Sequence, residues 1–399
     1  MSSSDSFGTS IQGEIIIIEP AANVQVGHMR EKLEVIVKAV TSEGKKVTLV
    51  TWEPLSKPLA TPGVKILTVW TFARFLSRLI PRKILAKHVD YCTYLQGFIH
   101  AGCRKIPVIG MTSSDPWGPL LASLFFPLPK RFLLRMLHPG VSLREGTSRV
   151  SPRRLGGFLK LAGRGAELVV FNDFLKKAIE SSWAVPAKQR LHAVSEMMDY
   201  QEAPRPLPNR NVLLVSGFDN ERRTPLGNLE TIKDFAGLQE VILQHPSDQP
   251  LETFCRDWSQ RPSSWRISRV TSYVTGKDWE ELFVRSRFTL VAYDQNFVQS
   301  SGIFLQSVSF GRPVVSTRFP DALSLFEKHG RLGVLYDQDR PDTLRRALEE
   351  IISWRENEWR EFCQARSRLV HDVDSVSVFR RYWEILHHRN RTQIDNGLT

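Results

Sequence analysis

The stretch FTLVAYDQNFVQSSGIFLQSVSFGRPVVSTRF, residues 288–319, decides the fold of this chain. Phe288–Tyr293 is a short apolar run that predicts a strand. Ser300–Phe310 places apolar side chains at helical spacing, and the glycine and proline that follow predict the end of that helix. Pro313–Thr317 predicts the next buried strand. The order strand, loop, helix, strand is the βαβ unit of a parallel sheet.

The start of this helix predicts an anion-binding site. The amides of Ser301 and Gly302 would lie at a helix N-terminus beside the carboxyl ends of two parallel strands, where a phosphate group is favoured. An ordinary βαβ unit that binds nothing has the same pattern. The patterns in the other segments of the sequence are needed to distinguish these two interpretations.

The same pattern occurs in both halves of the chain. With 399 residues the chain is too long for one typical core, which predicts two domains. Glu14–Glu19, a helix from about His28 and Lys46–Trp52 open the first half as strand, helix and strand. Val212–Ser216 starts the pattern again after a proline-rich stretch.

The predicted fold class is therefore α/β, with two Rossmann-like doubly wound domains. The predicted divisions are a disordered N-terminus at 1–12, an N-terminal domain at 13–195, a linker at 196–211, a C-terminal domain at 212–372, and a C-terminal helix with a frayed tail at 373–399. We expect that last helix to pack back towards the N-terminal domain.

Positive charge is concentrated in the first half. Residues 71–164 hold 16 Lys and Arg against only 3 Asp and Glu, which predicts an anionic partner or a solvated basic surface. Thr71–Ile80 and Phe125–Gly140 mix large apolar residues with Lys and Arg, a composition that suits helices lying on anionic lipid headgroups. Packing of the same helices in the core, with a basic solvent face, is the alternative.

The leader, membrane-span, cysteine and nucleic-acid-binding patterns of the sequence indicate the expected location and partners of the protein. The sequence shows no secretory leader and no apolar run of about 18 residues, so we expect a cytoplasmic protein, peripheral on the inner membrane face. Four scattered cysteines fit neither a disulfide framework nor a CxxC metal site. No helix-turn-helix, zinc or RNA-binding pattern accompanies the basic residues, so nucleic acid is not an expected partner.

Three motifs of the second half give the chain a resemblance to a known family. They are SGIFLQSVSFGRPVVST, VTGKDWEELFVRSRFTLVAY and GRLGVLYDQDRPDTLRRAL. With two Rossmann-like domains, they resemble the GT-B-fold glycosyltransferases, in particular the large group that contains family 4. The resemblance implies transfer of a sugar from a nucleotide-diphosphate sugar, held mainly by the C-terminal domain at a cleft, to a lipid-linked or polysaccharide acceptor.

The resemblance implies a set of donor-binding residues without a metal ion or a bound cofactor, since the nucleotide-diphosphate sugar is a co-substrate. Amides at the helix N-terminus and a cationic side chain of the preceding loop would stabilise the leaving diphosphate. The candidates are Gly217, Arg222, Arg223, Tyr273, Ser300, Ser301, Gly302 and Gln306.

One departure from the family pattern affects donor recognition. The family signature has two glutamates eight positions apart, and alignment on Gly311-Arg312-Pro313 puts Val298 and Gln306 at those places. The amide of Gln306 can still bond a ribose hydroxyl, whereas Val298 cannot bond a sugar hydroxyl. A non-catalytic GT-B-like subunit that binds a nucleotide or scaffolds a partner is therefore the alternative to an enzyme, and an epimerase of this fold is a further one.

Three residues of the N-terminal half are catalytic candidates. His28 stands where a βα loop would face the cleft, and its imidazole could accept the proton of an acceptor hydroxyl. Asp115 and His138 are the other two. Asp337-Gln338-Asp339 and Asp372-Val373-Asp374 resemble an Asp-x-Asp metal signature, but their places beside the closing helices favour acidic loops and N-caps.

Overall fold

The computed structural model divides the chain into two compact units. It describes residues 13–22, 29–102, 106–113, 116–136, 141–144, 147–181, 189–198, 206–216, 225–244, 249–259, 263–272, 274 and 276–387. The first unit comprises 1–141, 149–199 and 373–399, and the second comprises 142–148 and 200–372. The change from one to the other at residue 200 falls inside the stretch predicted as a linker.

The first unit is built on a parallel sheet of seven strands in the order β3-β2-β1-β4-β5-β8-β9. The strands are β1 (Glu14–Ile18), β2 (Lys46–Thr51), β3 (Lys65–Thr68), β4 (Val108–Ser113), β5 (Phe132–Met136), β8 (Glu167–Val170) and β9 (Leu191–Ala193). The helices are α1 (Met29–Ser42), α2 (Thr71–Ser77), α3 (Arg82–Gly102), α4 (Trp117–Phe125), α5 (Pro152–Gly163), α6 (Asp173–Glu180) and α15 (Ser375–His387). Between β5 and α5, β6 (Val141–Arg144) pairs with β7 (Thr147–Val150) as a separate two-stranded sheet, and residues 142–148 of it belong to the second unit.

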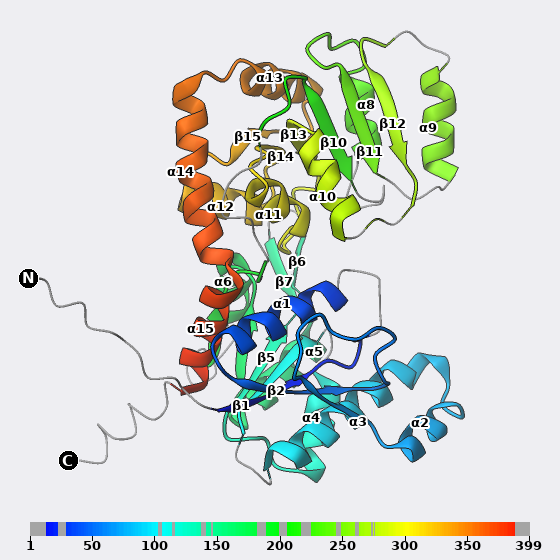
Figure 1. Cartoon of the computed structure of the whole chain (residues 1–399), viewed down its shortest axis with the longest axis vertical. Coiled ribbons are helices and arrows are strands. Elements are labelled where there is room, and N and C mark those ends of the chain that lie inside the picture. The colour runs from blue at the N-terminus through cyan, green and yellow to red at the C-terminus, as the bar shows by residue number, and fades with distance from the viewer. Residues whose placement is uncertain are drawn as a thin grey trace, which may run out of the picture. The chain divides into compact units, whose positions relative to one another are not determined.

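Helices cover both faces of this sheet (Figure 1). On one face, apolar side chains of α1 and α15 pack on alternate residues of the central strands, such as Ile15, Ile17 and Leu133. On the other face α3 comes so close that a Cβ atom at Gly97 would lie 2.3 Å from a side-chain atom of Ile18. The last helix therefore completes the core of the unit that begins the chain.

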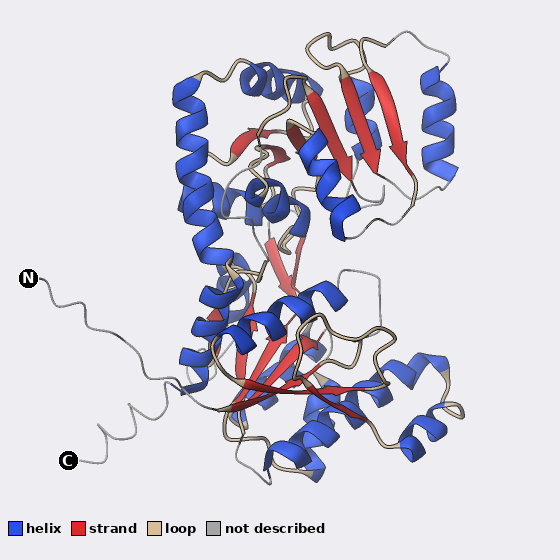
Figure 2. Ribbon diagram, viewed as in Figure 1, coloured by secondary structure: helices blue, strands red, loops and turns tan. Residues whose placement is uncertain are grey.

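The second unit is built on a parallel sheet of six strands in the order β12-β11-β10-β13-β14-β15. The strands are β10 (Val212–Ser216), β11 (Glu240–Gln244), β12 (Arg266–Val270), β13 (Phe288–Val291), β14 (Val314–Thr317) and β15 (Gly333–Tyr336). The helices are α8 (Pro225–Thr231), α9 (Gln249–Ser259), α10 (Gly276–Arg285), α11 (Gly302–Ser309), α12 (Pro320–His329), α13 (Pro341–Ile352) and α14 (Glu356–Val373). Figure 2 shows helices on both sides of this sheet.

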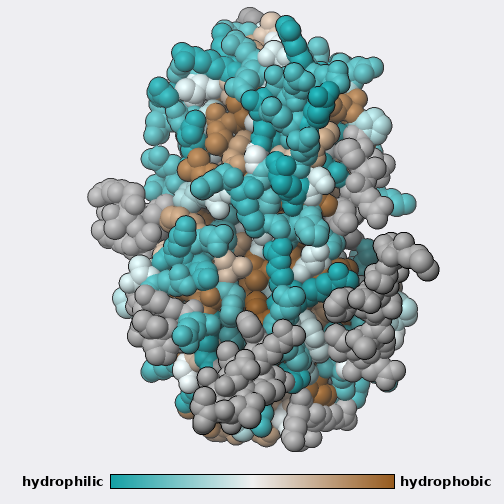
Figure 3. All heavy atoms as spheres, turned by 90° about the vertical axis from the view of Figure 1, so that its left-hand side faces the viewer, coloured by the Kyte–Doolittle hydropathy of each residue, from teal (hydrophilic) through white to brown (hydrophobic). Residues whose placement is uncertain are grey.

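The two sheets confirm the predicted α/β fold class. The surface over α14 is mainly hydrophilic in the upper part of Figure 3, as expected for a helix with one buried side. None of the described helices is both long enough and apolar enough to span a bilayer. Among the described cysteines, Cys92, Cys255 and Cys363 are all free thiols.

One predicted helix is wrong. Phe125–Gly140 was expected to include an amphipathic membrane helix, but Phe132–Met136 within it is β5, a strand whose five residues are all buried. Arg135 lies in that core with its guanidinium over the rings of Phe171 and Tyr382, at 5.1 and 5.9 Å from their centroids. Its charge is therefore not part of a lipid-facing surface.

Candidate functional site

The N-terminus of α11 lies at the carboxyl edge of the second sheet, between β13 and β14. Ser301 is the N-cap residue, and its hydroxyl oxygen accepts a hydrogen bond of 3.2 Å from the backbone N–H of Phe304. The N–H of Leu305 donates to the carbonyl of Ser301 at 3.1 Å. The cap therefore satisfies one of the amides that a helix start leaves without an intrahelical partner.

The N–H groups of Gly302 and Ile303 are the next two donors at this helix start. No acceptor within the described segments bonds either N–H group, and both residues are only partly buried. A Cβ atom built on Gly302 would meet no atom within 4 Å, so the space beside this first helical residue is open. The structure thus shifts the predicted pair of amides by one residue, because Ser301 acts as the cap.

The loop between β13 and α11 is held in place by aromatic stacking. The rings of Tyr293 and Phe297 stack at 4.0 Å between centroids, and both contact Phe319 beyond β14. The hydroxyl of Thr317 accepts from the N–H of Tyr293 at 3.1 Å and donates to its carbonyl at 2.6 Å. The hydroxyl of Ser301 donates to that of Tyr293 at 3.3 Å. This support fixes the helix start before any ligand binds.

Ser300 connects this loop to the next helix. Its hydroxyl donates to a carboxylate oxygen of Asp321 at 3.4 Å, and Asp321, in the first turn of α12, is only 2 % exposed. A carboxylate at the start of α12 is favoured by the partial positive charge of the helix N-terminus. The predicted donor-binding residues Ser300, Ser301 and Gly302 therefore lie together at the edge of the sheet.

Gln306 is fixed by α10. Its side-chain carbonyl accepts a hydrogen bond of 3.0 Å from the indole N–H of Trp279, which is 7 % exposed. With the carbonyl oxygen bound to the indole, the side chain presents its NH₂ group as donor to a ligand. Val298, at the other place of the family's glutamate pair, is 5 % exposed.

The Gly311-Arg312-Pro313 sequence ends α11 by a defined mechanism. Gly311 has φ 77°, a left-handed conformation that favours glycine, and the N–H of Arg312 bonds the carbonyl of Ser307 at 2.9 Å. The guanidinium of Arg312 is fully buried and donates to the carbonyls of Phe283 at 2.7 Å and Pro206 at 2.9 Å. Arg312 therefore holds the end of α10 and the chain before β10 against α11.

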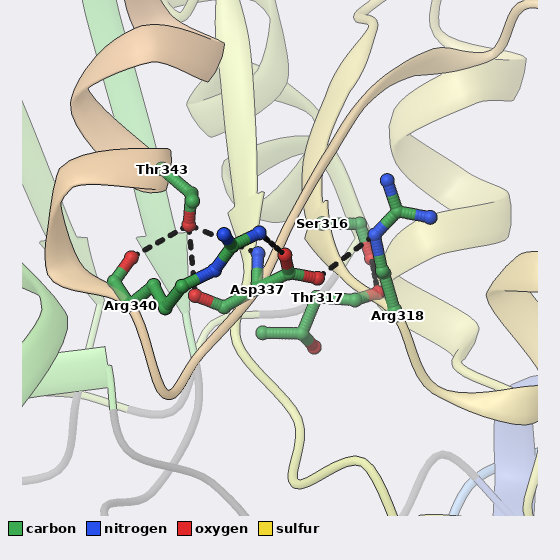
Figure 4. A network of polar contacts seen from close by, with 6 residues as sticks. All are labelled: Ser316, Thr317, Arg318, Asp337, Arg340 and Thr343. Carbon is green, nitrogen blue, oxygen red and sulfur yellow. Dashed lines mark hydrogen bonds and ion pairs between the residues drawn. The ribbon is translucent and has the colours of Figure 1, made fainter.

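A second polar network lies at the ends of β14 and β15 (Figure 4). Asp337 forms ion pairs with Arg318, at 2.9 Å, and with Arg340. The hydrogen bond from Arg340 is the main cause that lowers the pKa of Asp337, and the charge of Arg318 adds to it. Thr343 bonds the backbone of Asp337 in both directions. One carboxylate thus holds two cationic side chains at this edge of the sheet.

The remaining predicted site residues fall outside the described residues. These are His28, Asp115, His138, Gly217, Arg222, Arg223 and Tyr273. The structure therefore neither brings them together nor separates them, and their roles stay predictions.

Sequence reasoning missed three groups that the structure places at or near this site. The N–H of Ile303 was overlooked because the helix was expected to begin earlier. Trp279 lies 27 positions from Gln306, and no local pattern links them. Arg318 carried one signal, its place directly after a predicted buried strand.

Three aspartates of the two Asp-x-Asp sequences bond groups of the protein itself. The carboxylate of Asp374 accepts from the N–H of Ser377 at 2.9 Å and caps α15. Asp372 pairs with Lys328, and Asp337 is bound by the two arginines described above. Within the part of the chain that the structure describes, no group of three or more His, Cys, Asp and Glu is arranged to hold a metal ion.

Comparisons with known proteins identify the fold. No protein-family model matches the chain, and no curated protein matches it by sequence. Among solved structures, Anabaena HepE in complex with UDP and glucose aligns with 94 % of this chain and 99 % of its own, at TM-score 0.62 and 14 % identity. A glycosyltransferase from Rickettsia africae aligns over 94 % and 99 %, at 0.66 and 11 %. The lipopolysaccharide outer core galactosyltransferase WaaB aligns over 95 % and 100 %, at 0.63 and 12 %.

These matches span almost the whole chain, so the chain has the GT-B fold. The recognition made from the three sequence motifs is confirmed at the level of the fold. At identities this low, the likeness assigns no substrate.

Proposed function

We propose that this protein is a metal-independent glycosyltransferase that takes a sugar from a nucleotide-diphosphate sugar. The observation that carries the proposal is the start of α11, where the N–H groups of Gly302 and Ile303 have no acceptor among the described residues and the space beside the Cα of Gly302 is open. A diphosphate is the part of such a donor that a helix N-terminus favours most. The match to HepE, a structure solved with UDP and glucose, supports the same class of ligand.

The proposed mechanism depends on charge that develops on the leaving diphosphate. As the glycosidic bond breaks, negative charge grows on the phosphate oxygens, and donors already fixed in place stabilise it most. The stacked loop and the Ser301 cap fix the amides of α11. Arg222 or Arg223 would add a positive charge and do the work that a metal ion does in other transferases. His28, Asp115 and His138 remain the candidates for accepting the acceptor's proton.

We propose that the nucleoside is held through Gln306. Because Trp279 occupies the carbonyl oxygen of Gln306, the NH₂ group would donate to a ribose hydroxyl oxygen. Gly217 and Tyr273 complete the proposed donor set. The side chain of the buried Val298 is apolar, so recognition of the transferred sugar would fall to its polar neighbours in the loop.

The proposed acceptor is lipid-linked or a polysaccharide precursor, reached at the inner face of a membrane. The basic excess of residues 71–164 supports an anionic surface as partner. The match to WaaB, a lipopolysaccharide outer core galactosyltransferase, supports polysaccharide biosynthesis as the setting. The second candidate function is a non-catalytic nucleotide-binding subunit, which Val298 and Gln306 at the places of the two glutamates favour.

The test compares nucleotide binding by two glycine variants. Gly302→Val would put methyl groups into the open space at the start of α11 and should weaken UDP or GDP binding at least about tenfold, equal to about 1.4 kcal/mol. Gly156→Val, in α5, is the matched control, because a Cβ atom there also meets no atom within 4 Å. Calorimetric titration with UDP, GDP and their sugars measures the affinities.

The outcomes separate the candidate functions. Binding by the wild type and the Gly156 variant, loss in the Gly302 variant, and transfer to an acceptor support the glycosyltransferase. Binding without transfer or donor hydrolysis across a donor panel supports the non-catalytic subunit, and turnover without an acceptor supports an epimerase. Absence of binding by any nucleotide overturns the proposed site.

A further inference from the structure

Exposed apolar side chains are concentrated in one part of the chain. Of the eight large apolar side chains that the described surface exposes most, seven lie between residues 66 and 125. They are Ile66 (39 %), Trp70 (46 %), Phe75 (57 %), Leu79 (75 %), Leu121 (38 %), Leu124 (59 %) and Phe125 (73 %), and the eighth is Leu323 (41 %) of the second unit. Single exposed apolar residues need no explanation, but a group of seven in one region does.

These residues lie on β3, on α2 and the residues flanking it, and on α4, and both helices are supported by α3. Ala73 of α2 and Val89 of α3 pack on the same small core of Trp52, Val69 and Cys92. On the other side, the ring of Phe125 in α4 lies 6.0 Å from that of Tyr91 in α3. In Figure 1 both α2 and α4 lie at the lower end of the first unit, where α3 runs between them. We call the seven residues the apolar tip.

The two segments that carry the apolar tip have charges of one sign. Residues 65–79 and 117–136 contain no Asp or Glu, whereas Lys65, Arg78 and Lys130 are exposed there. None of these three forms an ion pair with a described residue. Beside α4, the exposed Arg164 donates to the hydroxyl of Ser123. Large apolar side chains with interspersed cations, and tryptophan among them, are typical of protein surfaces that lie in the lipid headgroup region.

The structure corrects where this surface lies. The sequence placed its second part at Phe125–Gly140, but that stretch enters the core as β5. The exposed apolar residues instead occupy α4, which ends at Phe125. The surface therefore consists of the end of β3, α2 with the turn after it, and the last turns of α4.

We propose that the apolar tip inserts into the headgroup region of an anionic lipid bilayer, with the surrounding lysines and arginines on the lipid phosphates. This inference deepens the proposed function, and rests on it for its purpose, because it places the protein where a lipid-linked acceptor would be found. A second copy of this chain is a poorer occupant, since a symmetric dimer through the tip would bring two positively charged surfaces together.

The experiment is flotation of the full chain with vesicles. We expect it to float with equal parts of phosphatidylcholine and phosphatidylglycerol, less with phosphatidylcholine alone, and less in high salt. Leu79→Glu combined with Phe125→Glu should reduce the partition coefficient on anionic vesicles at least about tenfold, because both side chains would have to leave water on insertion. Leu323→Glu, which changes an exposed leucine of the second unit, should leave it unchanged.

A second pair of variants isolates the charge. Arg78→Gln with Lys130→Gln should lower binding about thirtyfold at low salt and flatten its salt dependence, because each basic residue near the surface contributes about 1 kcal/mol. Lys277→Gln, also exposed but in the second unit, is the control.

Three results would overturn the inference. They are equal flotation of the Leu79/Phe125 variant and the wild type, no flotation of the wild type, and a dimer in solution that the Leu79/Phe125 variant abolishes. Transfer to a soluble acceptor tests the proposed function separately. A protein that transfers sugar but does not float contradicts only this inference, and one that floats without binding nucleotides contradicts only the proposed function.

Discussion

The helices α11 and α2 are both short and rich in apolar residues, yet one is buried and the other is not. In α11, Phe304 and Val308 are fully buried and Leu305 is 2 % exposed. In α2, Phe75 is 57 % exposed, and Leu79 directly after the helix is 75 % exposed. The start of α11 is the proposed donor site, and α2 is part of the proposed membrane surface.

The position of the adjoining strand explains the difference. α11 connects β13 to β14, two neighbouring strands inside the sheet, so strands and α10 surround it. α2 follows β3, which is the edge strand of its sheet, so part of its surface has no strand to cover it. A helix that connects two neighbouring strands is covered by them, so its N-terminus can form a rigid site. A helix that follows an edge strand keeps one of its sides uncovered.

The largest expected effect tests the rigidity of the α11 region. Arg312→Met keeps the approximate length of the side chain but removes the charged donor from the carbonyls of Phe283 and Pro206. Loss of these two hydrogen bonds from a fully buried guanidinium should lower the free energy of unfolding by about 3 to 5 kcal/mol, since each bond to a charged group contributes about 1.5 to 3 kcal/mol. Urea denaturation measures it, and Arg78→Met, beside α2, is the control with a change within about 0.5 kcal/mol. Equal losses in the two variants would remove the contrast.

Acid should weaken the unit that contains α11 through His329. This residue, 3 % exposed at the end of α12, has a pKa lowered from 6.5 to about 4, first by burial and then by Lys328 and Arg368, against the opposing charge of Asp372. Between these pH values the unfolded chain binds the proton and the folded protein does not. The contribution of neutral His329 to the free energy of unfolding is therefore complete above pH 6.5. It is lost as the pH falls towards 4, which lowers the free energy of unfolding by about 2 to 3 kcal/mol.

The measurement is the free energy of unfolding of the second unit at several pH values. His329→Gln should flatten the decrease between pH 6.5 and 4, because glutamine does not titrate. His371→Gln replaces an exposed histidine of α14 and should leave the decrease unchanged. A slope that is the same in all three proteins would show that His329 does not carry it.

The sequence predicted best those elements whose burial follows from their own residues. Val212–Ser216 is β10 with the predicted bounds, and the predicted strand Pro313–Thr317 contains β14 (Val314–Thr317). Each is a continuous β-branched or apolar run, typical of a parallel sheet covered on both faces. The Gly-Arg-Pro ending of α11 was predictable for a similar reason, since the backbone needs of a helix end are local.

Elements that depend on distant partners were not predictable. The mixed apolar and basic composition of Phe125–Gly140 suggested a lipid-facing helix, but Arg135 within it is buried under Tyr382, a residue almost 250 positions later in the chain. The same applies to the site, where Ser300–Gly302 followed from the βαβ pattern but the Trp279–Gln306 contact did not. Local periodicity cannot indicate which helix will cover a strand.

The smallest expected effect on the free energy of unfolding concerns α2. Phe75→Ala removes a large apolar side chain that is mostly in water, so the free energy of unfolding should change by less than about 0.5 kcal/mol. Alanine is also a better helix former, which offsets part of any lost contact. The same variant should float less well with anionic vesicles, since the ring would no longer enter the lipid. A loss of stability above about 1 kcal/mol would instead mean that Phe75 packs within the unit, and α2 would then differ from α11 in degree only.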